Sequence, residues 1–143
     1  MHKQRGFSLV ELMVVLVIIG ILGIFAIPTY QDYQVKARVM ELFALAQPAK
    51  LAVTEALIAG EKLETITHET LGLTNLDDTG VLKTLTIAAG VIQITADGTK
   101  LGLSAKENVT FSLTPTKTGA VTQWACTTPA AFKKYLPSLC SAK

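Results

Sequence analysis

Glu11 is the one ionisable residue in an apolar stretch that runs from Phe7 to Ile27 and is otherwise interrupted only by Ser8. A charged side chain inside such a segment costs about 2.5–3.5 kcal/mol on scales of membrane insertion. An ionisable group kept at that cost is a functional candidate and needs a partner of opposite charge. Glu11 is therefore the first residue to which we assign chemistry.

Cys126 and Cys140 are the only two cysteines of the chain. In an exported domain two cysteines indicate a disulfide, which here would close a loop of about 15 residues and add roughly 3 kcal/mol of stability. A metal site is a poor alternative, because these thiols and the distant His68 do not form a four-ligand set of recognisable spacing. We predict a Cys126–Cys140 disulfide.

The apolar stretch that holds Glu11 is 21 residues long, and as a helix it is about 30 Å long, enough to cross a bilayer. A cleaved signal peptide would end in small residues, whereas Ile27 is followed by Pro28 and helix-favouring sequence, so a retained segment is favoured. Lys3 and Arg5 precede the stretch and place the N-terminus in the cytoplasm. The sequence predicts a single-pass membrane protein with its C-terminal domain outside.

The residues G-F-S-L-V-E-L-M at positions 6–13, behind a short basic leader, resemble the processing site of type IV prepilins of the type IVa class. The resemblance implies that a prepilin peptidase and methyltransferase removes residues 1–6 by cutting after Gly6 and then N-methylates Phe7. It also implies that Glu11 is needed for assembly, and it extends to a disulfide in the C-terminal region.

Cleavage after Gly6 would leave a positive amine on Phe7, four residues before Glu11. The two charges can pair on one helix, or Glu11 of one subunit can neutralise Phe7 of a neighbour and so fix the register of a filament. Methylation keeps the charge of the amine, so either pairing survives it.

Gly20, Gly23 and Pro28 weaken the second half of the apolar helix, because glycine lowers helix propensity and proline removes a hydrogen bond. The resemblance implies local unwinding around Pro28 in the filament. A simple kink at Pro28 is the alternative.

Residues 29–60 are predicted to continue as an amphipathic helix that Pro48 bends. Its apolar residues form two stripes of helical spacing. One stripe contains Tyr30, Tyr33, Ala37, Met40 and Ala44, and the other contains Val39, Phe43, Ala46, Ala49, Val53 and Leu57.

Residues 61–143 are predicted to form the globular head. Residues 61–80 are polar and should cover one edge of the sheet that follows. Alternating apolar residues predict four strands, at 81–87, 91–95, 109–113 and 121–126, with turns at Ala89–Gly90, Asp97–Gly98 and Pro115–Gly119. The fold class is α+β: a long N-terminal helix, membrane-spanning at residues 7–28 and amphipathic at 29–60, packed on a four-stranded antiparallel sheet with a disulfide-closed C-terminal region.

Removal of Lys3 and Arg5 with the leader leaves 11 basic and 11 acidic residues, a net charge of zero. These charges are segregated: residues 55–78 hold six acids and one lysine, whereas residues 108–143 hold four lysines and no acid. One hypothesis is that the basic region of one subunit faces the acidic loop of another. A rival is that Lys117, Lys133 and Lys134 bind DNA.

The sequence contains no catalytic triad, phosphate loop or metal-ligand cluster, so we predict neither an enzyme nor a cofactor. The resemblance implies a structural pilus subunit whose partners are copies of itself, the prepilin peptidase, the inner-membrane assembly machinery and an outer-membrane secretin. The extracellular filament would serve adhesion to a host surface, twitching motility or DNA uptake. The alternatives are a minor pilin, a type II secretion pseudopilin and a DNA-binding module.

Overall fold

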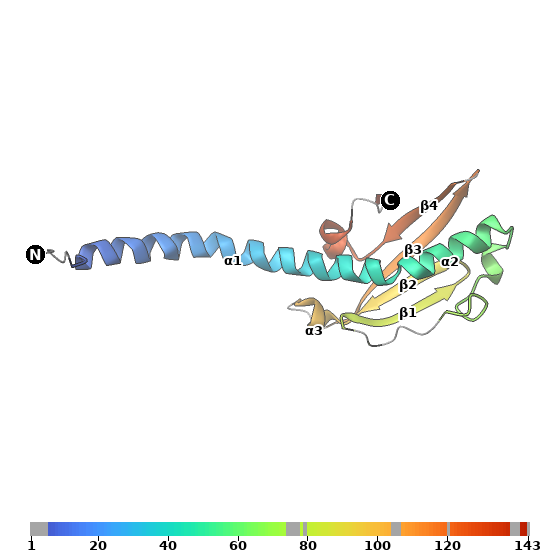
Figure 1. The fold of residues 1–143 in the computed structure, drawn as a ribbon, viewed down its shortest axis with the longest axis horizontal. Helices are drawn as coiled ribbons and strands as arrows, with labels where there is room; N and C mark the ends of the chain where they lie inside the picture. Colours follow the sequence, from blue (N-terminus) through green and yellow to red (C-terminus); the bar gives the residue numbers. More distant parts are fainter. Residues whose placement is uncertain are drawn as a thin grey trace, which may run out of the picture. The chain divides into compact units, whose positions relative to one another are not determined.

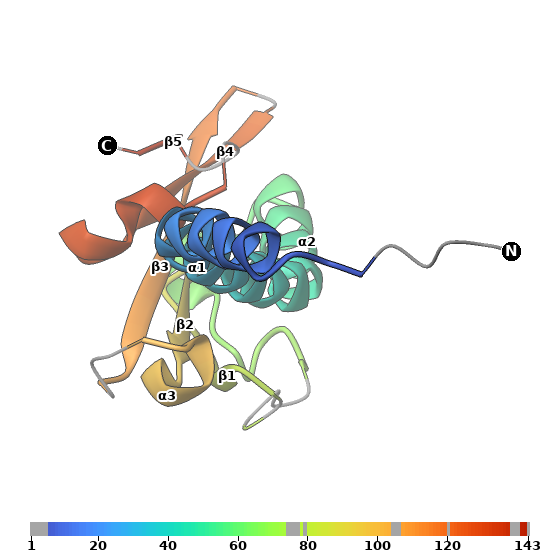
Figure 2. The ribbon, with the colours of Figure 1, turned by 90° about the vertical axis from the view of Figure 1, so that its left-hand side faces the viewer.

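The computed structural model describes residues 6–73, 78, 80–103, 107–119, 121–137 and 141–142. The chain divides into two compact units, Met1–Gln34 and Val35–Lys143, which we call the stem and the head. The elements of each unit are drawn in Figure 1 and, after a quarter turn, in Figure 2.

Helix α1 runs from Leu9 to Leu45 and is continuous through Pro28. Helix α2 follows from Gln47 to Ile58, so the predicted bend appears as an interruption at Ala46, two residues before Pro48. Pro48 cannot donate a hydrogen bond and its ring crowds the preceding turn. Helical bonding resumes at once, because the N–H of Lys50 donates to the carbonyl oxygen of Ala46 at 3.0 Å.

Only one of the two predicted stripes enters the core of the head. The stripe that begins at Val39 is buried along its whole length, with exposed fractions of no more than 7%, whereas Met40 of the other stripe is 46% exposed. The buried side chains of this helical face pack against one face of the sheet, in a core that includes Phe111, Ile92 and Leu85. The predicted packing of the helix on the sheet is thus confirmed.

The sheet contains the four predicted antiparallel strands, in the order of the sequence. They are β1 (Leu82–Ala88), β2 (Val91–Ala96), β3 (Val109–Thr118) and β4 (Val121–Thr127). The structure adds β5 (Ser141–Ala142), which pairs in parallel with β4 at Ala125 and Cys126 and which the sequence did not predict.

Two predicted turns were wrong. Asp97–Gly98 does not form a hairpin turn: Asp97 caps a short helix, α3 (Gly98–Leu101). The turn predicted at Pro115–Gly119 begins later, because β3 continues through Pro115 to Thr118. Proline is tolerated there because the pairing of β2 with β3 ends at Leu113, which leaves Pro115 with a strand partner on one side only.

The segment between α2 and β1 covers the outer edge of the sheet, as predicted. It contains a short 3₁₀ helix, η1 (Leu63–Thr65), and then runs beside β1. The carbonyl oxygen of Ile66 accepts from the N–H of Gly90, and the N–H of His68 donates to the carbonyl oxygen of Ile87. These bonds satisfy backbone groups that would otherwise form an open sheet edge.

The C-terminal part of the head is held by aromatic contacts. A second 3₁₀ helix, η2 (Ala130–Tyr135), places Phe132 against Phe111 with ring centroids 6.4 Å apart. Phe111 in turn contacts Phe43 of α1 at 5.9 Å. Edge-to-face contacts of this kind fix η2 to the core.

Candidate functional site

The predicted cleavage bond lies in a non-helical and exposed segment. Gly6, Phe7 and Ser8 precede α1 and have no helical conformation. Gly6 is exposed, and the Phe7 side chain is 83% exposed. Exposed segments outside regular structure are the preferred targets of peptidases, so the Gly6–Phe7 bond has the local structure that cleavage needs.

Glu11 already has a hydrogen-bond partner in the unprocessed chain. The backbone N–H of Ser8 donates to Oε2 of Glu11 at 3.4 Å. Ser8 immediately precedes α1 and Glu11 is the third residue of the helix, which is the spacing of a capping box. The sequence analysis missed this second role, although the S-x-x-E pattern at residues 8–11 is its signal. The carboxylate is therefore held within one turn of the amine that cleavage would create on Phe7.

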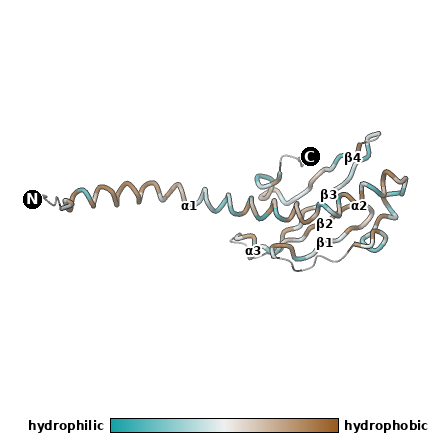
Figure 3. The backbone as a smooth tube through the Cα atoms, viewed as in Figure 1, coloured by the Kyte–Doolittle hydropathy of each residue, from teal (hydrophilic) through white to brown (hydrophobic). Residues whose placement is uncertain are grey.

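The helix that carries Glu11 exposes apolar side chains on all sides of the stem. Between Phe7 and Ile27 the large apolar side chains are 47% to 83% exposed. Figure 3 shows the corresponding apolar run along the first half of α1. By length and composition this is one helix apolar enough to cross a membrane. So large an apolar surface must be covered by lipid or by other helices.

Gly20, Gly23 and Pro28 lie within the continuous part of α1, and an added methyl group at either glycine would meet no other side chain. The helix of the single subunit is therefore intact at the predicted weak point. The unwinding predicted for the filament stays a prediction.

Only one of the two cysteines lies in the part of the chain that the structure describes. Cys126 lies in β4 and is buried at 5% exposure, whereas Cys140 lies outside the described residues. The chain returns to β4 directly after Cys140, since Ser141 pairs with Ala125 and Ala142 with Cys126. The disulfide therefore stays a prediction.

One of the three lysines proposed to bind DNA has a structural role. Nζ of Lys117 donates to the carbonyl oxygen of Leu57 at 2.9 Å, at the C-terminal end of α2. A cation at this end adds a second donor to a carbonyl group that also accepts from the N–H of Gly60, and it offsets the helix dipole. No sequence signal marks this contact, because the two residues are 60 positions apart. Lys133 and Lys134 both lie on η2 and are exposed.

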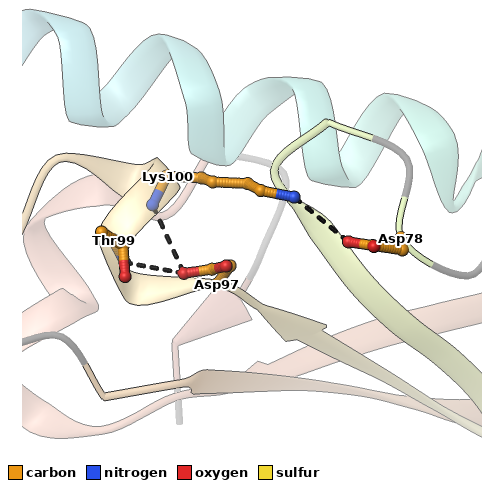
Figure 4. Close-up of polar contacts among 4 residues, drawn as sticks. All are labelled: Asp78, Asp97, Thr99 and Lys100. Atoms are coloured by element: carbon orange, nitrogen blue, oxygen red, sulfur yellow. Dashed lines mark hydrogen bonds and ion pairs between the residues drawn. The ribbon is translucent and has the colours of Figure 1, made fainter.

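A polar cluster around α3 anchors the neighbouring segments, as Figure 4 shows. Oδ1 of Asp97 accepts from the N–H groups of Thr99 and Lys100, and the bond from Thr99 contributes most to lowering the pKa of Asp97. Nζ of Lys100 lies 3.1 Å from Oδ1 of Asp78, and Nη1 of Arg38 donates to the carbonyl oxygen of Lys100 at 2.6 Å. The cluster joins α1, α3 and the end of the segment before β1.

A small groove of about 200 Å³ lies between the helices and β4. Its lining includes Met40, Phe43 and Trp124, and the ammonium group of Lys50 lies 5.3 Å from the centre of the Trp124 ring. Partial burial lowers the pKa of Lys50, and the ring compensates part of the lost hydration of its charge. Within the described residues, no three His, Cys, Asp or Glu side chains gather closely enough to hold a metal ion.

Comparison with known protein families gives one match within the stem and one within the head. Residues 1–27 match the model of the prokaryotic N-terminal methylation motif, and residues 35–141 match the model of pilin, a bacterial filament protein. The chain is 32% identical to "Fimbrial protein Q" of Moraxella bovis over 98% of this chain and 99% of that protein.

Two further relatives match over shorter regions. "Prepilin peptidase-dependent protein D" of Escherichia coli (strain K12) is 36% identical over 73% of this chain and 71% of its own length. "Type IV major pilin protein PilE" of Neisseria gonorrhoeae is 46% identical over 36% of this chain and 31% of its own length. With a methylation motif, an apolar stem helix and a head that matches over most of its length, the chain belongs to the type IV pilin family.

Proposed function

We propose that this chain is the major structural subunit of a type IV pilus. The observation that carries the proposal is the stem: an exposed apolar helix whose one carboxylate lies within about a turn of the non-helical Gly6–Phe7 bond. In this proposal a prepilin peptidase cuts after Gly6 and the same enzyme N-methylates Phe7. The subunit waits in the inner membrane and is then assembled into a helical polymer of identical copies.

The carboxylate of Glu11 would change partner during this process. Before cleavage it accepts one backbone N–H, from Ser8. After cleavage an ammonium group on Phe7 becomes available, either in the same subunit or in its neighbour. Inside a bundle of apolar helices an unpaired charge is strongly disfavoured, so the pairing selects one axial register.

The same proposal implies that the subunit has partners in both the inner and the outer membrane. Inner-membrane assembly proteins would extract the subunit, and an outer-membrane secretin would let the filament through. The filament would serve adhesion, twitching motility or DNA uptake. The assignment as the major rather than a minor subunit is supported by relatives whose names are major pilin and fimbrial protein.

The direct test is to shear surface filaments from cells that produce this chain and to measure the intact mass of the dominant subunit. We expect the mass of residues 7–143 plus one methyl group and minus two hydrogens. That value reports cleavage after Gly6, methylation of Phe7 and the Cys126–Cys140 disulfide together.

Two results would contradict the proposal. An uncut chain in the membrane would remove the processing step. A processed chain that is absent from the sheared fraction would instead indicate a minor pilin or a secretion pseudopilin.

A further inference from the structure

One apolar stripe of the long helix stays in solvent within the head. This outer stripe consists of Ala37, Met40, Ala44, Leu51 and Ile58, and all five side chains are exposed. Met40, Leu51 and Ile58 are 46%, 61% and 69% exposed. Successive members are three, four, seven and seven residues apart, which is the seven-residue repeat of helices that pack side by side.

The same repeat places two more residues on this face, Gln47 and Thr54, and neither is charged. The hydroxyl group of Thr54 donates to the carbonyl oxygen of Lys50 at 2.7 Å, so this donor is satisfied within the helix. Ala37 and Ala44 are small, and the distance between packed helices depends on the side chains at the contact. The outer stripe therefore allows close approach of another helix.

Charges of opposite sign flank the outer stripe. By helical position Glu41 and Glu55 lie on one side of it, and Lys36 and Lys50 lie on the other. Each lysine precedes a glutamate by five residues, so two parallel helices packed through this repeat bring a basic flank against an acidic flank. Antiparallel helices would bring like charges together. Among the described residues, the side chains of Glu41 and Glu55 have neither an ion pair nor a hydrogen bond.

Contacts within the head confirm that the two flanks lie on opposite sides. A methyl group added at Gly80, just before β1, would lie 3.7 Å from Oε1 of Glu41. The ammonium group of Lys50 instead lies over the ring of Trp124 in β4, and β1 and β4 are separated in the sheet by β2 and β3. Arg38, the cation nearest Glu41 in the sequence, donates to a carbonyl oxygen of α3.

We propose that the outer stripe packs on the long helix of a second copy of this chain, in parallel orientation, with the basic flank of one helix facing the acidic flank of the other. The inference rests on the proposed filament and extends its helix packing from the stem into the head. α1 runs without a break from the exposed apolar stem into the outer stripe, so both surfaces belong to one helix. The flanking charges fix orientation and partner more than affinity.

The flanking charges favour a second helix over lipid as the occupant. Contact of the outer stripe with hydrocarbon would bring Lys36, Glu41, Lys50 and Glu55 close to an apolar phase, where each charge is disfavoured. A second copy of the chain presents the same four residues and so offers a partner of opposite sign to each flank.

The test introduces one charge into the outer stripe of the full-length chain, and the readout is subunit in sheared filaments relative to subunit in the membrane. We expect Leu51→Lys to lower this ratio at least tenfold, because its ammonium group would be buried between helices. Val121→Lys is the matched control and should leave the ratio unchanged, since Val121 is 62% exposed and Leu51 is 61% exposed. Neither variant should change the Tm of the subunit in detergent, because both side chains are exposed there.

A second pair of variants tests the orientation. Glu41→Lys together with Glu55→Lys makes both flanks basic and should lower the ratio at least threefold. Glu61→Lys together with Glu64→Lys is the same change at two exposed positions beyond the end of α2, and it should leave the ratio unchanged.

Several outcomes would overturn the inference. A normal ratio for Leu51→Lys, or an equal loss for Val121→Lys, would show that the outer stripe makes no specific contact. A normal ratio for the variant with two basic flanks would remove the parallel orientation. Loss of Leu51→Lys from the membrane itself would assign the outer stripe to lipid. If the original chain yields no filament at all, the proposed function fails, and that failure is thereby distinguished from a failure of this contact alone.

Discussion

At the scale of single residues, one substitution can separate the local hydrogen bond of Glu11 from the intermolecular charge pairing that we propose for it. Glu11→Gln keeps a side-chain oxygen that accepts from the N–H of Ser8, because glutamine also completes a capping box. It removes only the charge. Leaving the Phe7 ammonium unpaired in an apolar bundle costs about 3 kcal/mol, or more than a hundredfold in assembly.

We therefore expect Glu11→Gln to be cleaved and methylated normally but to give at least a hundredfold less sheared filament. Mass spectrometry of the membrane fraction checks processing, and quantitative blotting of the sheared fraction checks assembly. Ser8→Ala, which keeps the carboxylate, is the matched control. Full assembly of Glu11→Gln would show that the charge is not needed.

Asp97 supports a second prediction at this scale. The N–H groups of Thr99 and Lys100 favour the ionised carboxylate, and they lower its pKa below the ordinary value. A group with a lowered pKa adds stability above its unfolded value of about 4, and this stability is lost as the pH falls through the folded value.

Asp97→Ala should therefore lower the Tm of the full chain in detergent at pH 7, and the difference from the original chain should shrink toward pH 3. Asp97→Asn, which keeps an acceptor for the cap, should lie between the two at pH 7. Thermal unfolding measured at several pH values checks this. A difference that does not depend on pH would show that the ionised cap contributes nothing.

At the scale of elements, the turn between β1 and β2 is the clearest case of a backbone that restricts its residues. Ala89 and Gly90 have φ values of 48° and 71°, both in the left-handed region. Glycine adopts this region freely, whereas other residues lose roughly 1–2 kcal/mol there. A methyl group on Gly90 would also collide with the side chain of Leu63.

The two positions should thus respond in opposite directions. Gly90→Ala should destabilise the head by at least about 1–2 kcal/mol, from the backbone term alone. Ala89→Gly should stabilise it by about 0.5–1 kcal/mol, because relief of strain exceeds the added entropy of the unfolded chain. Urea unfolding of both variants is the measurement, and equal effects of the same sign would refute the turn geometry.

At the scale of the whole molecule, the C-terminal end of the chain is joined to the sheet by its last strand. The short β5 supplies two residues of pairing with β4. A disulfide between Cys126 and Cys140 would add roughly 3 kcal/mol by closing a loop of about 15 residues. We expect Cys126→Ala, Cys140→Ala and the double variant to lose similar stability, since removing either sulfur opens the same loop.

The measurement is denaturant unfolding of the three variants and of the original chain with and without reductant. Reductant should lower the stability of the original chain to that of Cys140→Ala and leave the variants unchanged. An original chain that is insensitive to reductant would contradict the disulfide.

Several elements were predictable because their signals are local. The apolar run, the alternation of the four strands and the Ala89–Gly90 turn depend on residues within a few positions of one another, and the structure confirms them. Asp97 was misjudged for a related reason: Asp-Gly is a hairpin signal, but the same aspartate also caps a helix, and local sequence does not separate the two.

The sequence by itself determined the stem, because a 21-residue apolar stretch with one carboxylate needs no tertiary contact to show that it can span a membrane. Only the tertiary structure decided which of two equivalent helical stripes is buried, since that choice depends on where the sheet packs. It alone showed that Pro115 is accommodated beyond the end of β2 and that Lys117 caps α2. Those outcomes depend on groups that are far apart in the chain. These groups interact, and so contribute to the free energy of folding, only when the fold brings them together.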